Sequence, residues 1–409
     1  MTRVRTALLC AATLFAATLQ TTAVASAASS AASATPAASR AARHCVGSPE
    51  PVDGQARQVL DIARQAKTEF DLNSVILRVT EDGREVVTGA LGESMTGVPA
   101  EPDMHFRAGS VAIAYLGTVL AQLADEGQVS LDDPVSRWLP DLPHADRITL
   151  RMLGASTSGL HDYVTDPDFL AALEAAPFRQ WTPQELVGYS TSHPLWYEPG
   201  TNWSYSHANF VLLGAALEKI TGTRLDKLLE QRVMDPLGLR DTRNSYTPDI
   251  PTPVLHAFTA ERGRYEESTF WNPSWTTAPG AVITTDICDL ARSAVAIGSG
   301  ELLSAQAFRT QLNPGTVGLG GPTATCPATV CIANTEATHY GLGILVLHGW
   351  VVQNPSFSGY AAIQAYLPDR HLAIAVATTK GCATPDGNTA QTIAERISEL
   401  LAPEQPLAG

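Results

Sequence analysis

The 409-residue sequence has little positive charge, few cysteines and no long apolar run after its N-terminal segment. Lys and Arg total 27 against 41 Asp and Glu, so the formal charge is −14. This excess of negative charge argues against a nucleic acid or an anionic membrane as a partner. No later stretch is long enough to cross a bilayer, so no membrane span is expected. The ten histidines have no zinc-like spacing, and phosphate-binding glycine loops and Gly-x-Ser-x-Gly are absent, so neither a metal nor a cofactor is expected.

The N-terminus has the three parts of a secretory signal peptide. Arg3 and Arg5 precede an apolar run over residues 7–19, and small residues follow up to Ala27. We expect cleavage near Ala27 and a secreted, extracellular protein. The sequence then divides into four parts: a signal peptide (1–27), an Ala/Ser-rich disordered spacer (28–54), one folded domain (55–402) and a C-terminal tail (403–409).

Five cysteines remain after the signal peptide. Cys326 and Cys331 bracket a tight loop, and a local disulfide is expected in an oxidising compartment. Cys45 and Cys382 would pair if the two chain ends meet, which would leave Cys288 as a buried thiol. Spacing alone does not fix this second connectivity.

Both ends of the predicted domain favour strands next to a helix. Helical spacing is found at 55–69 and 389–401, and hairpins are predicted for 74–80 with 85–91 and for 361–367 with 371–378. Between them, helix patterns dominate 149–303, at 183–189, 208–221, 225–233 and 286–297, and residues 315–338 are typical of a loop. The order predicts an α+β fold: one antiparallel sheet built from both chain ends and flanked by terminal helices, with an inserted, mainly helical region.

One nearly all-apolar helix is predicted after the turn at Ala108 and Gly109, with Ser110 at its start and Gly127 at its end. A helix that is apolar on every side belongs inside a core. Ser110 lies where unpaired N–H groups and the positive end of the helix dipole meet, which suits an anion or a reacting carbonyl. A plain N-capping role is the alternative, and this stretch alone favours it.

Several phrases occur together in a consistent order. They are 106–111 (FRAGSV), 127–140, 148–160, 198–214 (EPGTNWSYSHANFVLLG), 235–239 (DPLGL), 340–343 (YGLG) and Gly359-Tyr360. Over residues 55–402 they resemble the serine β-lactamase-like family, which includes class C β-lactamases, D-alanyl-D-alanine carboxypeptidases and related esterases. The resemblance implies a β-lactamase/transpeptidase-like fold with Ser110 as the nucleophile. The capping interpretation of Ser110 is then no longer the favoured one.

The resemblance also implies a proton-accepting lysine one helical turn after the serine, on the same helix face. Ile113 occupies that position, and no lysine occurs between Lys67 and Lys219. Serine is a weak nucleophile without an adjacent base. Since general acid–base assistance contributes about 10²–10⁴ in rate, this substitution predicts a loss of ordinary turnover.

The family's Tyr-x-Asn motif appears as Tyr205-Ser206-His207. The resemblance assigns proton transfer to Tyr205, whereas His207 replaces the asparagine that contacts substrate. Two interpretations of His207 stay open: it is a substitute base acting with Ser110 and Tyr205, or it is a changed residue hydrogen-bonding in a vacated pocket. The second is favoured. Trp203, near Tyr205, is the best candidate for substrate contact, and Trp271 and Trp275 are expected at the pocket or its rim.

The third family motif, a strand-borne Lys/His-x-Gly six residues before Gly359-Tyr360, appears as Gln353-Asn354-Pro355. Gln353 replaces the basic residue, and Pro355 replaces a glycine that lets the strand approach the serine. The resemblance implies oxyanion donors at the amides of Ser110 and Ser356. Proline adds bulk and removes an N–H, so the path of this strand is in question.

All three catalytic motifs are therefore altered, while the framework phrases are present. We expect a secreted serine hydrolase homologue that lacks ordinary penicillin or peptide hydrolysis and binds a small-molecule or peptide-like ligand. Two alternatives remain. The first is a repurposed enzyme acting on a peptide-like or ester substrate through Ser110, Tyr205 and His207, and the second is a non-catalytic, ligand- or partner-binding pseudoenzyme.

Overall fold

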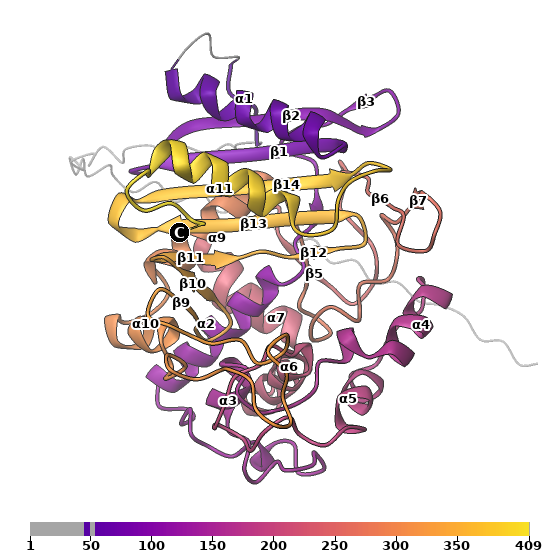
Figure 1. Cartoon of the computed structure of the whole chain (residues 1–409). Coiled ribbons are helices and arrows are strands. Elements are labelled where there is room, and N and C mark those ends of the chain that lie inside the picture. The colour runs from indigo at the N-terminus through magenta and orange to yellow at the C-terminus, as the bar shows by residue number, and fades with distance from the viewer. Residues whose placement is uncertain (1–44, 50–53, 409) are drawn as a thin grey trace, which may run out of the picture. The chain divides into compact units, whose positions relative to one another are not determined.

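The computed structural model describes residues 45–49 and 54–408 (Figure 1). The predicted signal peptide and most of the predicted spacer lie outside the described residues. The α-helices are α1 (Gly54–Glu69), α2 (Val111–Asp125), α3 (Leu150–Gly154), α4 (Pro167–Ala175), α5 (Pro183–Thr191), α6 (His207–Thr221), α7 (Leu225–Leu229), α8 (Asp235–Leu237), α9 (Ile287–Ser299), α10 (Ala305–Leu312) and α11 (Thr389–Leu401). Short 3₁₀ turns lie at Val135–Arg137, Tyr163–Thr165 and Pro368–Arg370, and one π-helical turn lies at Glu230–Met234.

The strands form one large and two small sheets. They are β1 (Leu72–Glu81), β2 (Arg84–Met95), β3 (Val98–Pro99), β4 (Phe106–Arg107), β5 (Arg243–Ser245), β6 (Phe258–Thr259), β7 (Glu266–Glu267), β8 (Val282–Thr285), β9 (Thr338–Tyr340), β10 (Leu345–Leu347), β11 (Trp350–Gln353), β12 (Ser356–Phe357), β13 (Tyr360–Leu367) and β14 (Leu372–Lys380). The large sheet has nine strands in the order β3-β2-β1-β14-β13-β11-β10-β9, with β12 also paired to β13. Its neighbours are antiparallel, and the central pairing of β1 with β14 joins the two chain ends. The predicted α+β fold is confirmed.

Two layers of helix cover this sheet. Helices α1 and α11 pack against one face, where their apolar residues share a core with the alternating buried side chains of the strands (Figure 1). Helix α9 packs against the opposite face, and the cluster to which it belongs continues into the helical region. Strands β13 and β14 are buried on both faces, which explains their nearly continuous apolar sequence.

Helix α2 lies in the larger core. Twelve of its fifteen residues are buried, as expected for a helix that is apolar on all sides. It contacts α3, α6, α7 and α10 of the helical region, and also β8. The helix ends as predicted, because Gly127 has φ 70° and its N–H bonds the Ala124 carbonyl at 3.1 Å. The start of α2 is thereby held at the boundary between the sheet and the helical region.

Two disulfides are present among the described residues. Cys326 pairs with Cys331, as predicted. The second pairing, which the sequence left open, is between Cys45 and Cys288 at the start of α9; the alternative of Cys45 with Cys382 does not form, and Cys382 is exposed and unbonded. The chain ends do meet at β1 and β14, but Cys382 follows β14 in a surface loop, whereas Cys45 lies beside Cys288.

The segments flanking the domain are partly fixed to it. Of the predicted spacer, residues 45–49 are held by the Cys45 disulfide and by a bond from the Ser48 amide to the Thr88 carbonyl at 2.8 Å. These few residues differ from the disorder expected for the spacer. In the tail, Leu407 is buried and Gln405 accepts a bond from the Trp350 indole at 2.9 Å. Within the described ranges, no helix has the length and apolar character needed to span a membrane.

Candidate active site

Ser110 occupies the N-cap position of α2, but its side chain makes no capping hydrogen bond. The preceding Gly109 has φ +40°, a conformation that a residue with a Cβ rarely adopts. A Cβ at Gly109 would lie 2.5 Å from the Phe357 ring and 2.9 Å from Pro355. Glycine therefore permits the close approach of β12 to the start of α2, and the partly accessible Ser110 hydroxyl is left free for another partner.

Ile113 lies one turn along α2 and is completely buried. Its carbonyl is so close to Gly343 that a Cβ there would lie 2.3 Å from the Ile113 oxygen. A dry, closely packed position suits an apolar side chain, and a lysine there would need a partner for its charge. Among the described residues, no hydrogen bond or ion pair joins a lysine to Ser110 or Tyr205.

Tyr205 is brought to Ser110, as the resemblance implies. The Tyr205 pKa is raised mainly by burial and further by the nearby Asp162 carboxylate, whereas a hydrogen bond with the Ser110 side chain acts in the opposite direction. No cation contributes to this balance. The Tyr205 phenol therefore stays protonated near neutral pH and cannot serve as a phenolate base for Ser110.

His207 begins α6, and Asp162 holds it in place. The carboxylate accepts the His207 backbone N–H at 3.1 Å and lies 3.1 Å from Nδ1 through both of its oxygens. Because Nδ1 faces a carboxylate, Nδ1 is the donor of this pair, and in the neutral ring Nε2 is then the acceptor. The His207 ring lies edge-on to Tyr205, with centroids 5.0 Å apart, and the described hydrogen bonds include none between the two side chains.

The strand that carries the third motif keeps its path despite Pro355. On one side of the proline Gln353 pairs with Gln364, and on the other Ser356 pairs with Ala361, so the register against β13 does not slip. The Pro355 carbonyl accepts a bond from the Ala362 N–H at 2.8 Å. Pro355 and Ala362 are therefore a hydrogen-bonded pair of the ladder, in which only the bond that a backbone N–H at residue 355 would donate is missing. The next pair, at Ser356, is then non-hydrogen-bonded, and its N–H points away from β13.

Gln353 points into the protein rather than into an open cleft. It is 3% exposed, and its side-chain amide donates to the Gly343 carbonyl. Beside it the Tyr340 ring lies 5.9 Å from the Tyr205 ring, and burial raises the pKa of Tyr340 far above its ordinary value. Gln353 and Ile113 thus contact the same Gly343, and the region is neutral where the resembling family carries two cations.

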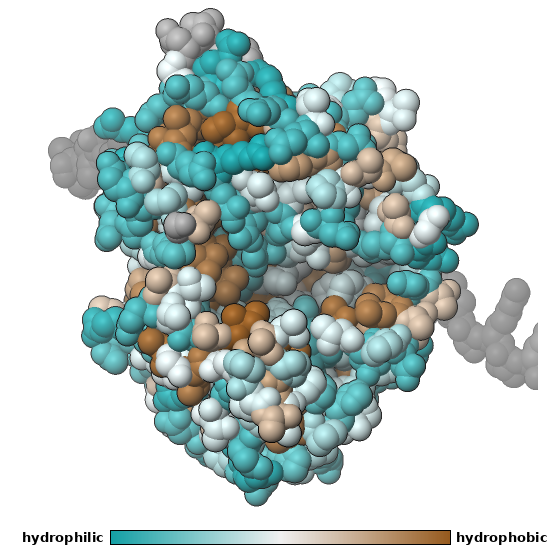
Figure 2. Space-filling view, viewed as in Figure 1, coloured by the Kyte–Doolittle hydropathy of each residue, from teal (hydrophilic) through white to brown (hydrophobic). Residues whose placement is uncertain are grey.

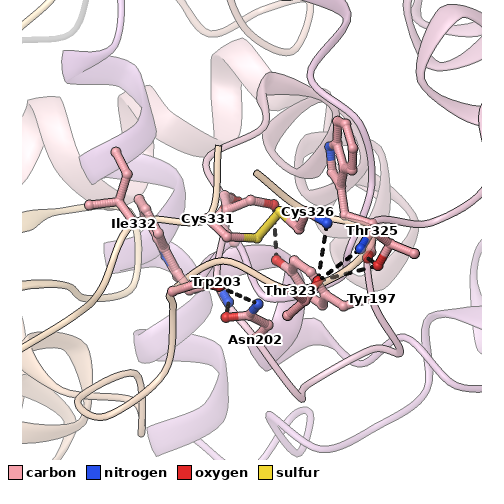
Figure 3. Close-up of a disulfide and its surroundings, with 12 residues drawn as sticks. Tyr197, Asn202, Trp203, Thr323, Thr325, Cys326, Cys331 and Ile332 are labelled. Atoms are coloured by element: carbon pink, nitrogen blue, oxygen red, sulfur yellow. Dashed lines mark hydrogen bonds between the residues drawn. A yellow bond between two sulfur atoms is a disulfide. The ribbon is translucent and has the colours of Figure 1, made fainter. Parts of the chain in front are cut away.

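Trp203 lies in the core, and its indole donates to the Ala155 carbonyl at 3.0 Å. Figure 3 shows it together with Asn202 near the loop closed by Cys326 and Cys331. The structure thus places Trp203 as a packing residue with a satisfied N–H. Its predicted contact with substrate stays a prediction.

The structure brings Ser110 and Tyr205 together, places His207 beside Tyr205, and sets the β12 strand of Ser356 against the start of α2. Sequence analysis did not identify Asp162 as a site residue. The signal was an acid following Ser158-Gly159-Leu160-His161, but nothing local indicated that it would meet His207, 45 residues later.

A serine at the start of a buried helix, with a protonated tyrosine beside it, is the arrangement of a serine hydrolase-like site. The chain belongs to the Beta-lactamase family, since the model of that family matches residues 60–396. This match covers the sheet as well as the helical region.

Curated relatives cover part of this length. Residues of this chain are 32% identical over 190 positions to esterase EstB of Burkholderia gladioli, covering 43% of this chain and 48% of the esterase. They are 31% identical over 193 positions to the D-alanyl-D-alanine-carboxypeptidase/endopeptidase AmpH of Escherichia coli K12, covering 45% and 48%. The matched part thus spans about half the length of these relatives.

Solved structures match most of the chain. A D-stereospecific amidohydrolase from Streptomyces sp. is 26% identical with a TM-score of 0.70, covering 84% of this chain and 98% of the other. The D-amino acid amidase of Ochrobactrum anthropi SV3, complexed with L-phenylalanine amide, is 22% identical with a TM-score of 0.70, covering 86% and 99%. The second likeness shows the fold alone.

Proposed function

We propose that this protein is an exported serine hydrolase homologue whose Ser110 site binds an ester or peptide-like carbonyl compound and lacks lysine-dependent hydrolysis of penicillins and D-alanyl peptides. The observation that carries the proposal is the completely buried Ile113 at the position of the base. Without a proton acceptor the serine hydroxyl is a weak nucleophile.

Binding of a carbonyl is supported by the backbone around Ser110. The N–H of an N-cap residue has no partner within its helix, and the Ser356 N–H points away from β13. Two such donors are what an oxyanion requires, and one donor is typically worth about 10²–10³ in kcat. The proposal is therefore that the backbone donors for binding a carbonyl are present, whereas the base for hydrolysis is missing.

A second candidate function is slow ester or amide turnover through Ser110, Tyr205 and His207. The observation in its favour is the Asp162 carboxylate on Nδ1, which leaves Nε2 of His207 as a base. Proton transfer would then have to pass by way of the Tyr205 phenol or a water molecule, because no direct bond joins the two side chains. A cleft that only binds, with no chemistry at Ser110, is the third possibility.

Active-site labelling distinguishes these functions. Wild type, Ser110→Ala, Ile113→Lys and the apolar control Ile113→Met are offered a reporter penicillin and a fluorophosphonate. We expect no penicillin label on wild type or Ile113→Met, a slow Ser110-dependent fluorophosphonate label, and faster labelling only in Ile113→Lys, by about 10²-fold or more. Brisk hydrolysis of nitrocefin by wild type contradicts the proposal.

His207→Asn tests the second candidate. If His207 is the base, fluorophosphonate labelling falls about 10²-fold or more. If labelling is unchanged, His207 has only a structural role. No fluorophosphonate label on any form except Ile113→Lys supports a cleft that binds without turnover.

Export is part of the proposal. The two disulfides agree with an oxidising compartment. Expression of the full chain in a secreting host should yield a mature protein that begins near residue 28. An intact N-terminus on the secreted or cell-retained protein, measured by mass spectrometry, contradicts the predicted cleavage.

A further inference from the structure

An apolar hollow of about 270 Å³ lies beside β12, outside the group of residues assigned above to proton transfer. Figure 2 shows hydrophobic surface at the margin of the hollowed region next to α4. Its lining residues come from α4, from the segment around residues 261–275 and from the β12 turn: Leu170, Leu173, Glu174, Pro177, Glu261, Arg262, Trp271, Trp275, Ser356, Phe357 and Ser358.

The hollow lies next to the Ser110 site and shares one wall with it. Ser356, whose amide is the proposed oxyanion donor, is one of its lining residues. The next residue, Phe357, lines it too, and its ring reaches within 2.5 Å of where a Cβ on Gly109 would lie. One wall of the hollow is therefore in contact with the residue that precedes Ser110. A molecule whose carbonyl lies at Ser110 can extend a substituent into this hollow.

The aromatic walls are held from behind. The Tyr163 hydroxyl donates to the Trp275 carbonyl at 2.6 Å, and the Trp275 ring lies edge-on to Phe357 with centroids 5.9 Å apart. Arg262 lies over Trp271 at 5.8 Å and is paired with Glu266 at 3.1 Å. These contacts pack the rings against their neighbours and leave the hollow open between them.

Size and chemistry point to one kind of group. An apolar protein cavity of about 150 Å³ holds benzene, so about 270 Å³ admits a phenyl or branched alkyl group with its linker. Two large apolar side chains are left exposed here: Leu170, which lines the hollow, is 38% exposed, and Phe270, which precedes the lining Trp271 in the sequence, is 44% exposed. Large apolar side chains left in contact with water beside a site are typical of a binding surface.

We infer that this hollow is the subsite for an aromatic or branched aliphatic substituent of the ligand whose carbonyl lies at Ser110. The inference depends on the proposed function only for the position of the carbonyl. Binding of the substituent itself requires no chemistry at Ser110.

Affinity for three simple amides tests this subsite. The probes are 3-phenylpropanamide, 4-methylpentanamide and acetamide, and binding is followed by tryptophan fluorescence and ligand-observed NMR. We expect the first two to bind at least about 10-fold more tightly than acetamide, since a single methylene in an apolar pocket already contributes about that factor. The Ser110→Ala variant should show the same preference.

A matched pair of variants locates the binding. Leu170→Glu introduces a charge at the hollow, and Val98→Glu introduces the same charge at an equally exposed aliphatic residue on β3, since the two side chains are 38% and 39% exposed. We expect Leu170→Glu to weaken 3-phenylpropanamide about 10-fold and Val98→Glu to leave it unchanged. Leu173→Trp, which fills the hollow with an apolar ring, should weaken it as well.

The result that overturns the inference is equal affinity for all three amides, or equal behaviour of Leu170→Glu and Val98→Glu. If the amides or variants behave equally while fluorophosphonate still labels Ser110, the subsite is contradicted and the proposed function stands. If 3-phenylpropanamide is preferred but Ser110 is not labelled, the subsite stands and the proposed function is contradicted.

Discussion

The starts of α2 and α9 are two buried helix N-termini that the protein treats in opposite ways. At α9 the N-cap is Asp286, which is 2% exposed and accepts the Asp289 N–H at 2.8 Å. Its burial, followed by the charges of Asp289 and Asp241, raises the pKa of Asp286 to about 7. At α2 the N-cap Ser110 makes no side-chain bond to its helix. One terminus is closed by its own side chain, whereas the other is left open.

The start of α6 lies between these cases. Its N-cap, Ser206, makes no side-chain cap either, but Asp162 approaches from another loop and accepts the His207 N–H. Helix N-termini attract anions, and two of the three are already supplied with a carboxylate of this chain. The open terminus at α2 agrees with the proposed binding of a carbonyl group there.

The largest expected effect concerns the open terminus. Ser356→Pro removes an N–H that the β-ladder does not use, whereas Ser356→Ala keeps it. We expect fluorophosphonate labelling of Ser110 to fall about 10²–10³-fold in the first variant and to be unchanged in the second. Circular dichroism and the melting temperature should show that both are folded. Equal labelling would mean that the Ser356 amide is not an oxyanion donor.

The next effect concerns the closed terminus. Because the folded-state pKa of Asp286 is raised, the folded protein binds the proton more tightly, and stability is lost as the pH rises from about 4 through about 7. Asp286→Asn keeps a capping oxygen and removes this titration. The unfolding free energy of wild type should therefore fall relative to the variant by up to about 1.4 kcal/mol per pH unit in that window and stay parallel above it. Urea unfolding at several pH values measures this, and parallel curves throughout contradict it.

A smaller effect distinguishes the cost of backbone strain at a positive φ from the cost of a steric clash. Gly109 and Gly127 flank α2, and both have positive φ, but only Gly109 has neighbours within 4 Å of an added Cβ. Gly127→Ala should cost about 1 kcal/mol in unfolding free energy, and Gly109→Ala should cost about 1–3 kcal/mol more because β12 must shift. Chemical denaturation compares the two. Equal costs would show that β12 is free to move away from α2.

The smallest expected effect uses two similar aspartates. Asp162 and Asp166 each accept helix N–H groups and each contact a histidine, His207 and His193 respectively. Asp162→Asn and Asp166→Asn each keep a capping oxygen, so each should lower stability by only about 0.3–1 kcal/mol, through the lost negative charge at the helix N-terminus. If His207 is not a base, the rate of Ser110 labelling in both variants stays within about twofold of the wild-type rate. A tenfold loss confined to Asp162→Asn would favour the second candidate function.

The sequence predicted the fold because the patterns that define it are local. The hairpins that became β1 with β2 and β13 with β14, and helix α11, follow from short periodicities and turn residues. The start of α2 followed from its turn residues in the same way. The resemblance then indicated which residues surround that start, and in the structure Tyr205 lies beside Ser110.

What the sequence could not predict depends on distant segments meeting. Cys45 reaches Cys288 because residues 45–49 run along β2. The spacing of cysteines in the sequence does not predict the course of this segment. The sequence left the path of the strand at Pro355 in question; the proline occupies a hydrogen-bonded pair in which only its missing donor is lost, so the register is kept. Asp162 meets His207 only after α6 is placed.

The unpaired Cys382 offers a thiol for covalent labelling. Among the described residues it is the one cysteine outside a disulfide, and it is exposed. It lies in the loop between β14 and α11, and Asn388 at the end of that loop donates to the Pro355 carbonyl at 3.0 Å. A maleimide dye on this thiol would thus sit on the segment that braces β12, where its emission can report whether occupancy of the cleft shifts that strand.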